Sequence, residues 1–125
     1  MGGIIVRYFL ANNKLENLGR VVMLAPPNKG TKLADFVSKF SIANEILGPA
    51  LKQLKTDKES LPNSLPSPKY EVGIIAGKYD YKAPTESTTL KNMKSFLLVP
   101  RVHTHIMEAD EVIRAIIRFL RKGKF

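Results

Sequence analysis

The chain has 125 residues, of which 44% are hydrophobic and 25% are charged. This is the composition of a globular protein, and the length predicts one domain over residues 1–125 and argues against a disordered chain. It has no cysteine, which excludes disulfides and thiolate metal sites and leads us to expect a cytoplasmic location. No stretch reaches the roughly 20 apolar residues that a membrane-spanning helix needs.

The net charge is +9, from 20 basic and 11 acidic residues. A basic excess of this size can mark a nucleic-acid or anionic-membrane partner. The charges are scattered, however, except over residues 114–124, and no aromatic and basic residues alternate as they do in RNA-binding motifs. We therefore expect a solvated basic surface rather than a nucleic-acid partner, with a basic binding module as the alternative.

The N-terminal third predicts a helix followed by a strand. Residues 4–13 are apolar on nearly all sides, which is typical of a buried helix. Residues 18–25 form an apolar run that stops at Pro26-Pro27, since prolines cannot continue a strand ladder. An uninterrupted apolar strand is expected to be buried on both faces, as in a parallel sheet.

The middle of the chain predicts two helices and a loop. Apolar residues recur at helical spacing over residues 31–40 and 43–54, with Thr31 as the expected N-cap of the first helix. Residues 56–69 hold three prolines and no periodicity, which indicates a surface loop.

The remaining elements complete an α/β pattern. Short apolar runs at residues 72–76 and 96–99 predict two more buried strands, each ended by glycine or proline. A final helix begins near Asp110 and ends at Gly123, with an apolar face expected at Ala109, Val112, Ile113, Ile116 and Leu120. Strands separated by helices or long connections pair in parallel, so we expect a three-layer α/β fold.

Two titratable residues follow the last two predicted strands. Asp80 lies four residues after Ala76, and His103 lies four residues after Val99. Sites in open parallel sheets form at the carboxyl ends of the strands, and acid before histidine is the chain order of an α/β-hydrolase triad. A lone histidine in such a loop is more often structural. A metal pair of His103 and His105 lacks a third ligand at a convincing spacing.

Several segments together resemble bacterial lipase- and esterase-like α/β-hydrolases over nearly the whole chain. Met1-Gly2-Gly3 resembles the end of the Gly-x-Ser-x-Gly turn that carries the nucleophile in these enzymes. The other similar segments are residues 25–35 after the first strand, 80–83 and 86–88 around the acid, 99–104 around the histidine, and 111–113 and 119–120 in the closing helix.

The resemblance implies the C-terminal part of an α/β-hydrolase fold and hydrolysis of a small ester or lipid, without a cofactor. Asp80 would orient His103, His103 would be the general base, and the backbone N–H of Met1 would be an oxyanion donor. The serine would precede Met1, and no serine of the chain lies in a Gly-x-Ser-x-Gly frame. We therefore expect these residues to be inactive alone, or active when a separate N-terminal segment supplies the serine.

Overall fold

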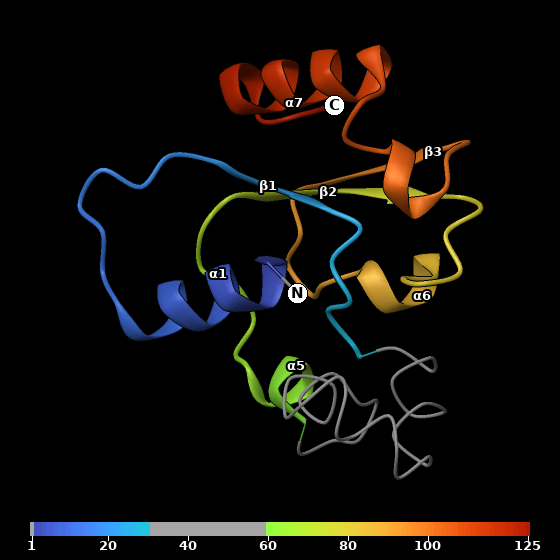
Figure 1. Ribbon diagram of the computed structural model, residues 1–125. Coiled ribbons are helices and arrows are strands. Elements are labelled where there is room, and N and C mark those ends of the chain that lie inside the picture. The colour runs from blue at the N-terminus through green and yellow to red at the C-terminus, as the bar shows by residue number, and fades with distance from the viewer. Residues whose placement is uncertain (1, 31–59) are drawn as a thin grey trace, which may run out of the picture.

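The computed structural model describes residues 2–30 and 60–125 of the chain (Figure 1). The helices predicted over residues 31–40 and 43–54 lie outside these ranges. The described elements, in chain order, are α1 (Gly2–Asn12), β1 (Val21–Leu24), α5 (Leu61–Ser64), β2 (Val72–Gly77), α6 (Thr85–Thr88), β3 (Ser95–Val99), the 3-10 turn η1 (His103–His105) and α7 (Asp110–Lys122). The short helix α5 corrects the expected loop over residues 56–69, since Ser60 and Pro62 start one helical turn there.

The three predicted strands are confirmed, and they form one parallel sheet in the order β1-β2-β3. Val21 is paired with Val72, and Gly73 with Ser95. Figure 1 shows α7 over one face of the sheet and α1 and α6 on the opposite side. The expectation of a parallel α/β fold with helices on both faces therefore holds for the described part of the chain.

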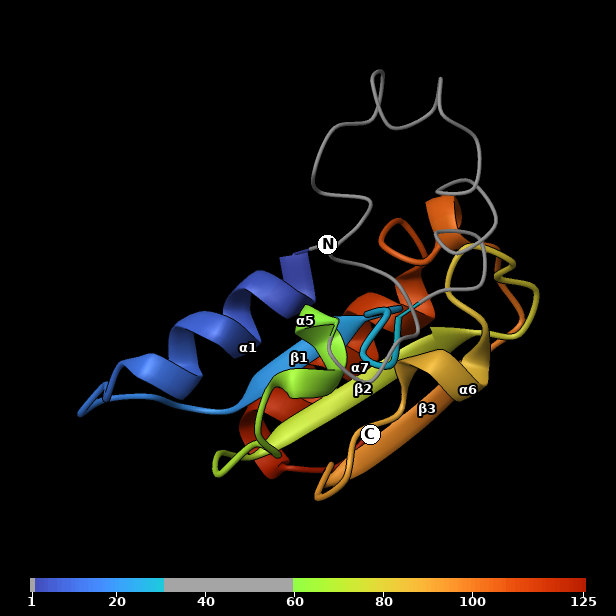
Figure 2. The same cartoon turned by 90° about the horizontal axis from the view of Figure 1, so that it is seen from below.

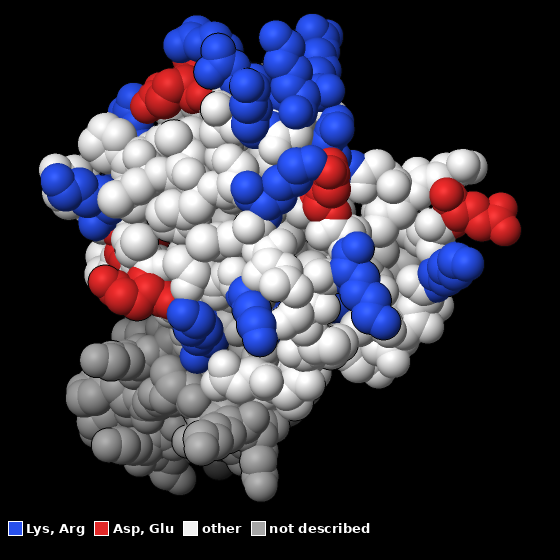
Figure 3. Space-filling model, turned by 180° about the vertical axis from the view of Figure 1, so that it is seen from behind, with Lys and Arg blue, Asp and Glu red and all other residues white. Residues whose placement is uncertain are grey.

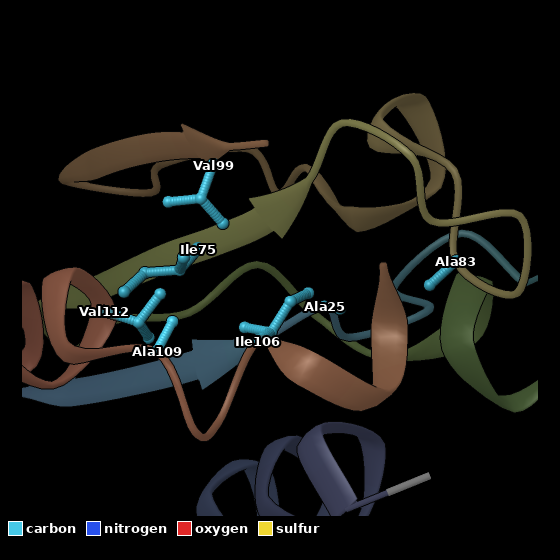
Figure 4. Close-up of a cluster of buried hydrophobic side chains, with 7 residues drawn as sticks. All are labelled: Ala25, Ile75, Ala83, Val99, Ile106, Ala109 and Val112. Carbon is cyan, nitrogen blue, oxygen red and sulfur yellow. The ribbon is translucent and has the colours of Figure 1, made fainter. Parts of the chain in front are cut away.

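The core lies on both faces of the central strand. All six residues of β2 are buried, whereas β1 and β3 are only partly buried, because they form the two edges. The expectation that β1 is buried on both faces was wrong for this reason. On the α7 face, Ile75 packs with six other buried residues, Ala25, Ala83, Val99, Ile106, Ala109 and Val112 (Figure 4).

The last helix is confirmed, but its buried face is turned from the predicted one. Val112 and Phe119 are both fully buried, while Ile113 and Leu120 are 43% and 45% exposed. Phe119 packs against Phe125, with 4.9 Å between the ring centroids, and both rings occupy the space that a side chain at Gly73 would need. As predicted, Gly123 ends the helix with a positive φ of 73°.

The first helix is confirmed at its predicted position, but it is not buried on nearly all sides as expected. Only Ile4 and Arg7 of α1 are buried, while Ile5 is 60% exposed and Phe9 is 48% exposed. Figure 2 shows the reason, since α1 lies at the outer edge of the sheet beside β1. No helix in residues 2–30 and 60–125 is long and apolar enough to span a membrane.

The orientation of α7 can be tested with two neighbouring residues. Phe119→Ala removes a fully buried ring and should lower the free energy of unfolding by about 3–5 kcal/mol. Leu120→Ala is the matched control, and because Leu120 is half exposed it should cost about 1 kcal/mol or less. Chemical denaturation measures both values, and a larger loss for Leu120→Ala would contradict the observed burial.

Candidate functional site

The carboxyl ends of β2 and β3 are held together by a close backbone contact at Gly77. The N–H of Lys78 donates to the carbonyl of Val99 at 2.8 Å, and the N–H of Tyr79 donates to the carbonyl of Arg101 at 3.2 Å. A Cβ at position 77 would lie 2.5 Å from the Arg101 oxygen, which is too close for any residue except glycine. Gly77 thus allows the loop after β3 to lie directly against the loop after β2.

Asp80 is fixed in the first of these loops. Its side chain is fully buried, and Oδ1 accepts the backbone N–H groups of Lys82 and Ala83, both at 2.9 Å. An aspartate that accepts backbone N–H groups two and three residues ahead stabilises a turn. Ala83 is itself buried in the core, so the turn is anchored and the second carboxylate oxygen has a fixed position.

His103 begins η1 in the second loop and contacts that second oxygen. Its Nδ1 lies 2.6 Å from Oδ2 of Asp80. An ionised carboxylate can only accept hydrogen bonds, so Nδ1 carries the proton and donates it. The structure thus brings together the two side chains that the sequence singled out.

When the ring is neutral, this tautomer leaves the other ring nitrogen of His103 with a free lone pair. Within the described residues, the Asp80 contact is the one hydrogen bond of the His103 side chain, and that side chain is 39% exposed. A neutral imidazole with a lone pair at Nε2 can accept a proton, and a buried carboxylate at Nδ1 stabilises the imidazolium that results. The pair therefore has the geometry of a general base with its positioning residue.

An ion pair ties the histidine loop to α7. Arg101 Nη2 lies 2.7 Å from Oε1 of Glu111. The pKa of Glu111 is lowered, first by a hydrogen bond with its own backbone N–H and then by Arg101. Because the pKa of Glu111 is lower in the folded chain, its carboxylate contributes to the stability of the fold. This stabilisation is present above the pKa of Glu111 in the unfolded chain and is lost as the pH falls through the pKa in the folded chain. Both side chains are about two-fifths exposed, so the ion pair serves mainly to position the loop.

The other sequence-based candidates do not join the pair. Met1 lies outside the described residues, so its role as an oxyanion donor stays a prediction. The side chain of His105 is 64% exposed and lies 3.6 Å from Glu108. In the described ranges no three His, Cys, Asp or Glu side chains group as metal ligands, and no serine there hydrogen-bonds to His103.

A buried polar network around Arg7 was not predicted from the sequence. Arg7 Nη1 donates to the carbonyl and to Oδ1 of Asn28, at 3.2 and 3.3 Å. Asn28 Nδ2 donates to the carbonyl of Thr88 at 2.7 Å. The network connects α1 to the loop after β1 and to α6. The available signal was Arg7 itself, a single basic residue inside an otherwise apolar helix.

Comparisons with protein-family models, with curated proteins and with solved structures find no match to this chain. The class of the protein therefore rests on its own geometry. That geometry defines a mixed α/β protein with a small parallel sheet, and a carboxylate–histidine pair at the carboxyl ends of its strands.

The tautomer of His103 gives a direct test of the pair. In the native chain, ¹⁵N NMR should show the proton of the neutral ring on Nδ1. Asp80→Asn keeps an oxygen for the turn but can present an amide N–H to Nδ1, so the proton should move to Nε2. His105 in the same spectra is the internal control and should not change. An unchanged His103 tautomer in the variant would show that Asp80 does not set it.

Proposed function

We propose that these residues are the C-terminal part of an α/β-hydrolase that cleaves carboxylic esters, with His103 as general base and Asp80 as its positioning residue. The observation that carries the proposal is the 2.6 Å contact between Asp80 Oδ2 and His103 Nδ1 at the carboxyl ends of adjacent parallel strands. Chain order and site location agree with this class. The lack of cysteine supports a cytoplasmic location for the enzyme.

In the proposed reaction, Nε2 of His103 removes the proton of a serine hydroxyl as its oxygen attacks the ester carbonyl. The ester C–O bond breaks, and the imidazolium returns the proton to the departing alcohol. Water then attacks the acyl-serine with the same assistance, which releases the carboxylic acid and restores the serine. Asp80 stabilises the imidazolium in both steps. The backbone N–H of Met1 is the proposed oxyanion donor.

We propose that the serine comes from a segment outside these 125 residues. In the described part of the chain, no serine contacts His103, and none of the chain's serines lies in a nucleophile-turn sequence. Without a nucleophile no acyl-enzyme forms, so we propose that the 125 residues are inactive alone. The segment belongs either to the same polypeptide, upstream of Met1, or to a separate N-terminal chain.

The edge of the sheet at β1 supports such a complementing segment. Among the described strands β1 pairs with β2 alone, so one side of its backbone is open to another strand. Helix α1 lies beside this edge (Figure 2), and α7 covers one face of the sheet. Both helices carry exposed apolar residues, Ile5 and Phe9 on α1 and Leu120 on α7. Arg20, which directly precedes β1, donates to the Leu120 carbonyl at 2.9 Å, so this part of α7 lies near the same edge.

The proposal predicts activity on complementation. The 125-residue chain should not be labelled by a serine-directed fluorophosphonate. A chain that also carries the segment with Gly-x-Ser should be labelled and should hydrolyse p-nitrophenyl esters. His103→Ala in the complemented protein should lower kcat on the order of 10⁴-fold or more.

His105→Ala is the matched control, because His105 is two residues away and its side chain is 64% exposed, with Glu108 as its ion-pair partner. It should leave kcat nearly unchanged. Stoichiometric labelling of the 125-residue chain would reject the proposal that it lacks its nucleophile. Equal activity of the His103→Ala and unsubstituted complemented proteins would reject the proposal that His103 is the general base.

A basic binding module is the second candidate, and the surface of α7 favours it. Arg114, Arg118 and Arg121 recur on one exposed side of this helix, and Figure 3 shows Lys and Arg side chains gathered over the end of the molecule where α7 lies. Such a module would bind anionic vesicles or nucleic acid with an affinity that falls steeply with salt. If the chain binds neither anionic vesicles nor nucleic acid at low salt, the binding-module candidate is rejected.

A further inference from the structure

A cavity lies away from the Asp80–His103 pair, between α1 and residues 66–70. Its volume is about 190 Å³, and its walls include Arg7, Leu10, Pro66, Lys69 and Tyr70. None of its lining residues belongs to the loops after β2 and β3. The residues around this cavity therefore have no role in the proposed ester hydrolysis.

The cavity is lined by a buried positive charge that has no negative partner in the described part of the chain. Arg7 is 4% exposed, and its hydrogen bonds within the described residues are to neutral oxygens. Besides Asn28, these are the carbonyls of Pro62 at 3.1 Å and Leu65 at 3.3 Å. Arg7 forms no ion pair with any residue of the described ranges. A buried cation is costly unless an anion compensates it, and burial accordingly lowers the pKa of Arg7.

Two hydrogen-bonding atoms of the cavity residues, Nε of Arg7 and the hydroxyl of Tyr70, are buried and have no hydrogen-bond partner among the described residues. Burial raises the pKa of Tyr70 above its usual value, and the charge of Arg7 only partly opposes this effect, so the hydroxyl keeps its proton and can donate. Lys69 adds an ammonium group at the same cavity. The lining residues include four with side-chain N–H or O–H donors, Arg7, Ser67, Lys69 and Tyr70, and no carboxylate, which suits an anion.

We propose that this cavity binds a small organic carboxylate, held by Arg7, Tyr70 and Lys69, with its apolar part against Leu10 and Pro66. Arginine is suited to carboxylates because its planar N–H groups match the two oxygens. An engineered apolar cavity of about 150 Å³ holds benzene, so the available space fits a ligand of the size of benzoate. Apolar walls favour such a ligand over inorganic phosphate, which has no apolar part to bury. The inference is independent of the proposed hydrolase function.

Benzoate is the probe for this site, and titration calorimetry of the 125-residue chain is the measurement. We expect saturable binding of benzoate, with weaker binding of benzyl alcohol, which lacks the charge, and of inorganic phosphate. Tyr70→Phe removes one hydroxyl and should weaken benzoate binding about 10-fold or more, as for other hydrogen bonds to charged groups. Lys69→Gln should also weaken it. Tyr8→Phe, on the exposed side of α1, is the matched control and should leave the affinity unchanged.

Arg7 also connects α1 to three carbonyl oxygens, so its replacement changes folding as well as binding. Tyr70→Phe and Lys69→Gln therefore carry the test, with thermal unfolding to show that both variants are folded. Lack of saturable benzoate binding would overturn the proposal. So would equal affinity for benzyl alcohol, a preference for phosphate, or unchanged benzoate affinity in both folded variants.

Discussion

The site depends on the close approach of two loops at Gly77. The Arg101 carbonyl lies where a side chain at position 77 would begin, so the loop after β3 can lie on the end of β2 only because this residue is glycine. That approach brings His103 within 2.6 Å of a carboxylate that two backbone N–H groups already hold in place. The pair is therefore pre-organised by backbone contacts, and a fixed geometry of this kind is what proton transfer at an active site requires.

A second buried charge organises the opposite face of the sheet. Arg7 connects α1 to the loop after β1 and to α5 by hydrogen bonds to backbone carbonyls. These neutral acceptors bind Nη1 and Nη2 but do not neutralise the charge, and Nε has no hydrogen-bond partner among the described residues. Arg7 thus connects elements of the fold and also places a positive charge at the cavity between α1 and residues 66–70. The two charged centres differ in this respect, since Asp80 has a titratable partner in His103 and Arg7 has none among the described residues.

The sequence predicted the strands, their parallel pairing and the two residues of the pair, because these depend on local signals. Apolar runs that end in glycine or proline mark buried strands, and the position of Asp80 and His103 after such strands follows from the topology. Burial of the helices was predicted less well. Phe119 rather than Leu120 enters the core because Gly73 leaves room for its ring, and α1 is exposed because it lies beside β1, at an edge of the sheet as far as the described residues show. Both depend on long-range neighbours that periodicity does not show, as does the contact of Arg7 with Asn28.

We propose that a serine from outside these residues completes the site beside an added strand at β1. The structure of the chain together with the segment that supplies Gly-x-Ser tests this proposal. We expect a strand of that segment paired with β1 and a serine oxygen at hydrogen-bonding distance, about 2.6–3.2 Å, from Nε2 of His103. A serine remote from His103, or a segment that leaves the β1 edge open, would contradict it.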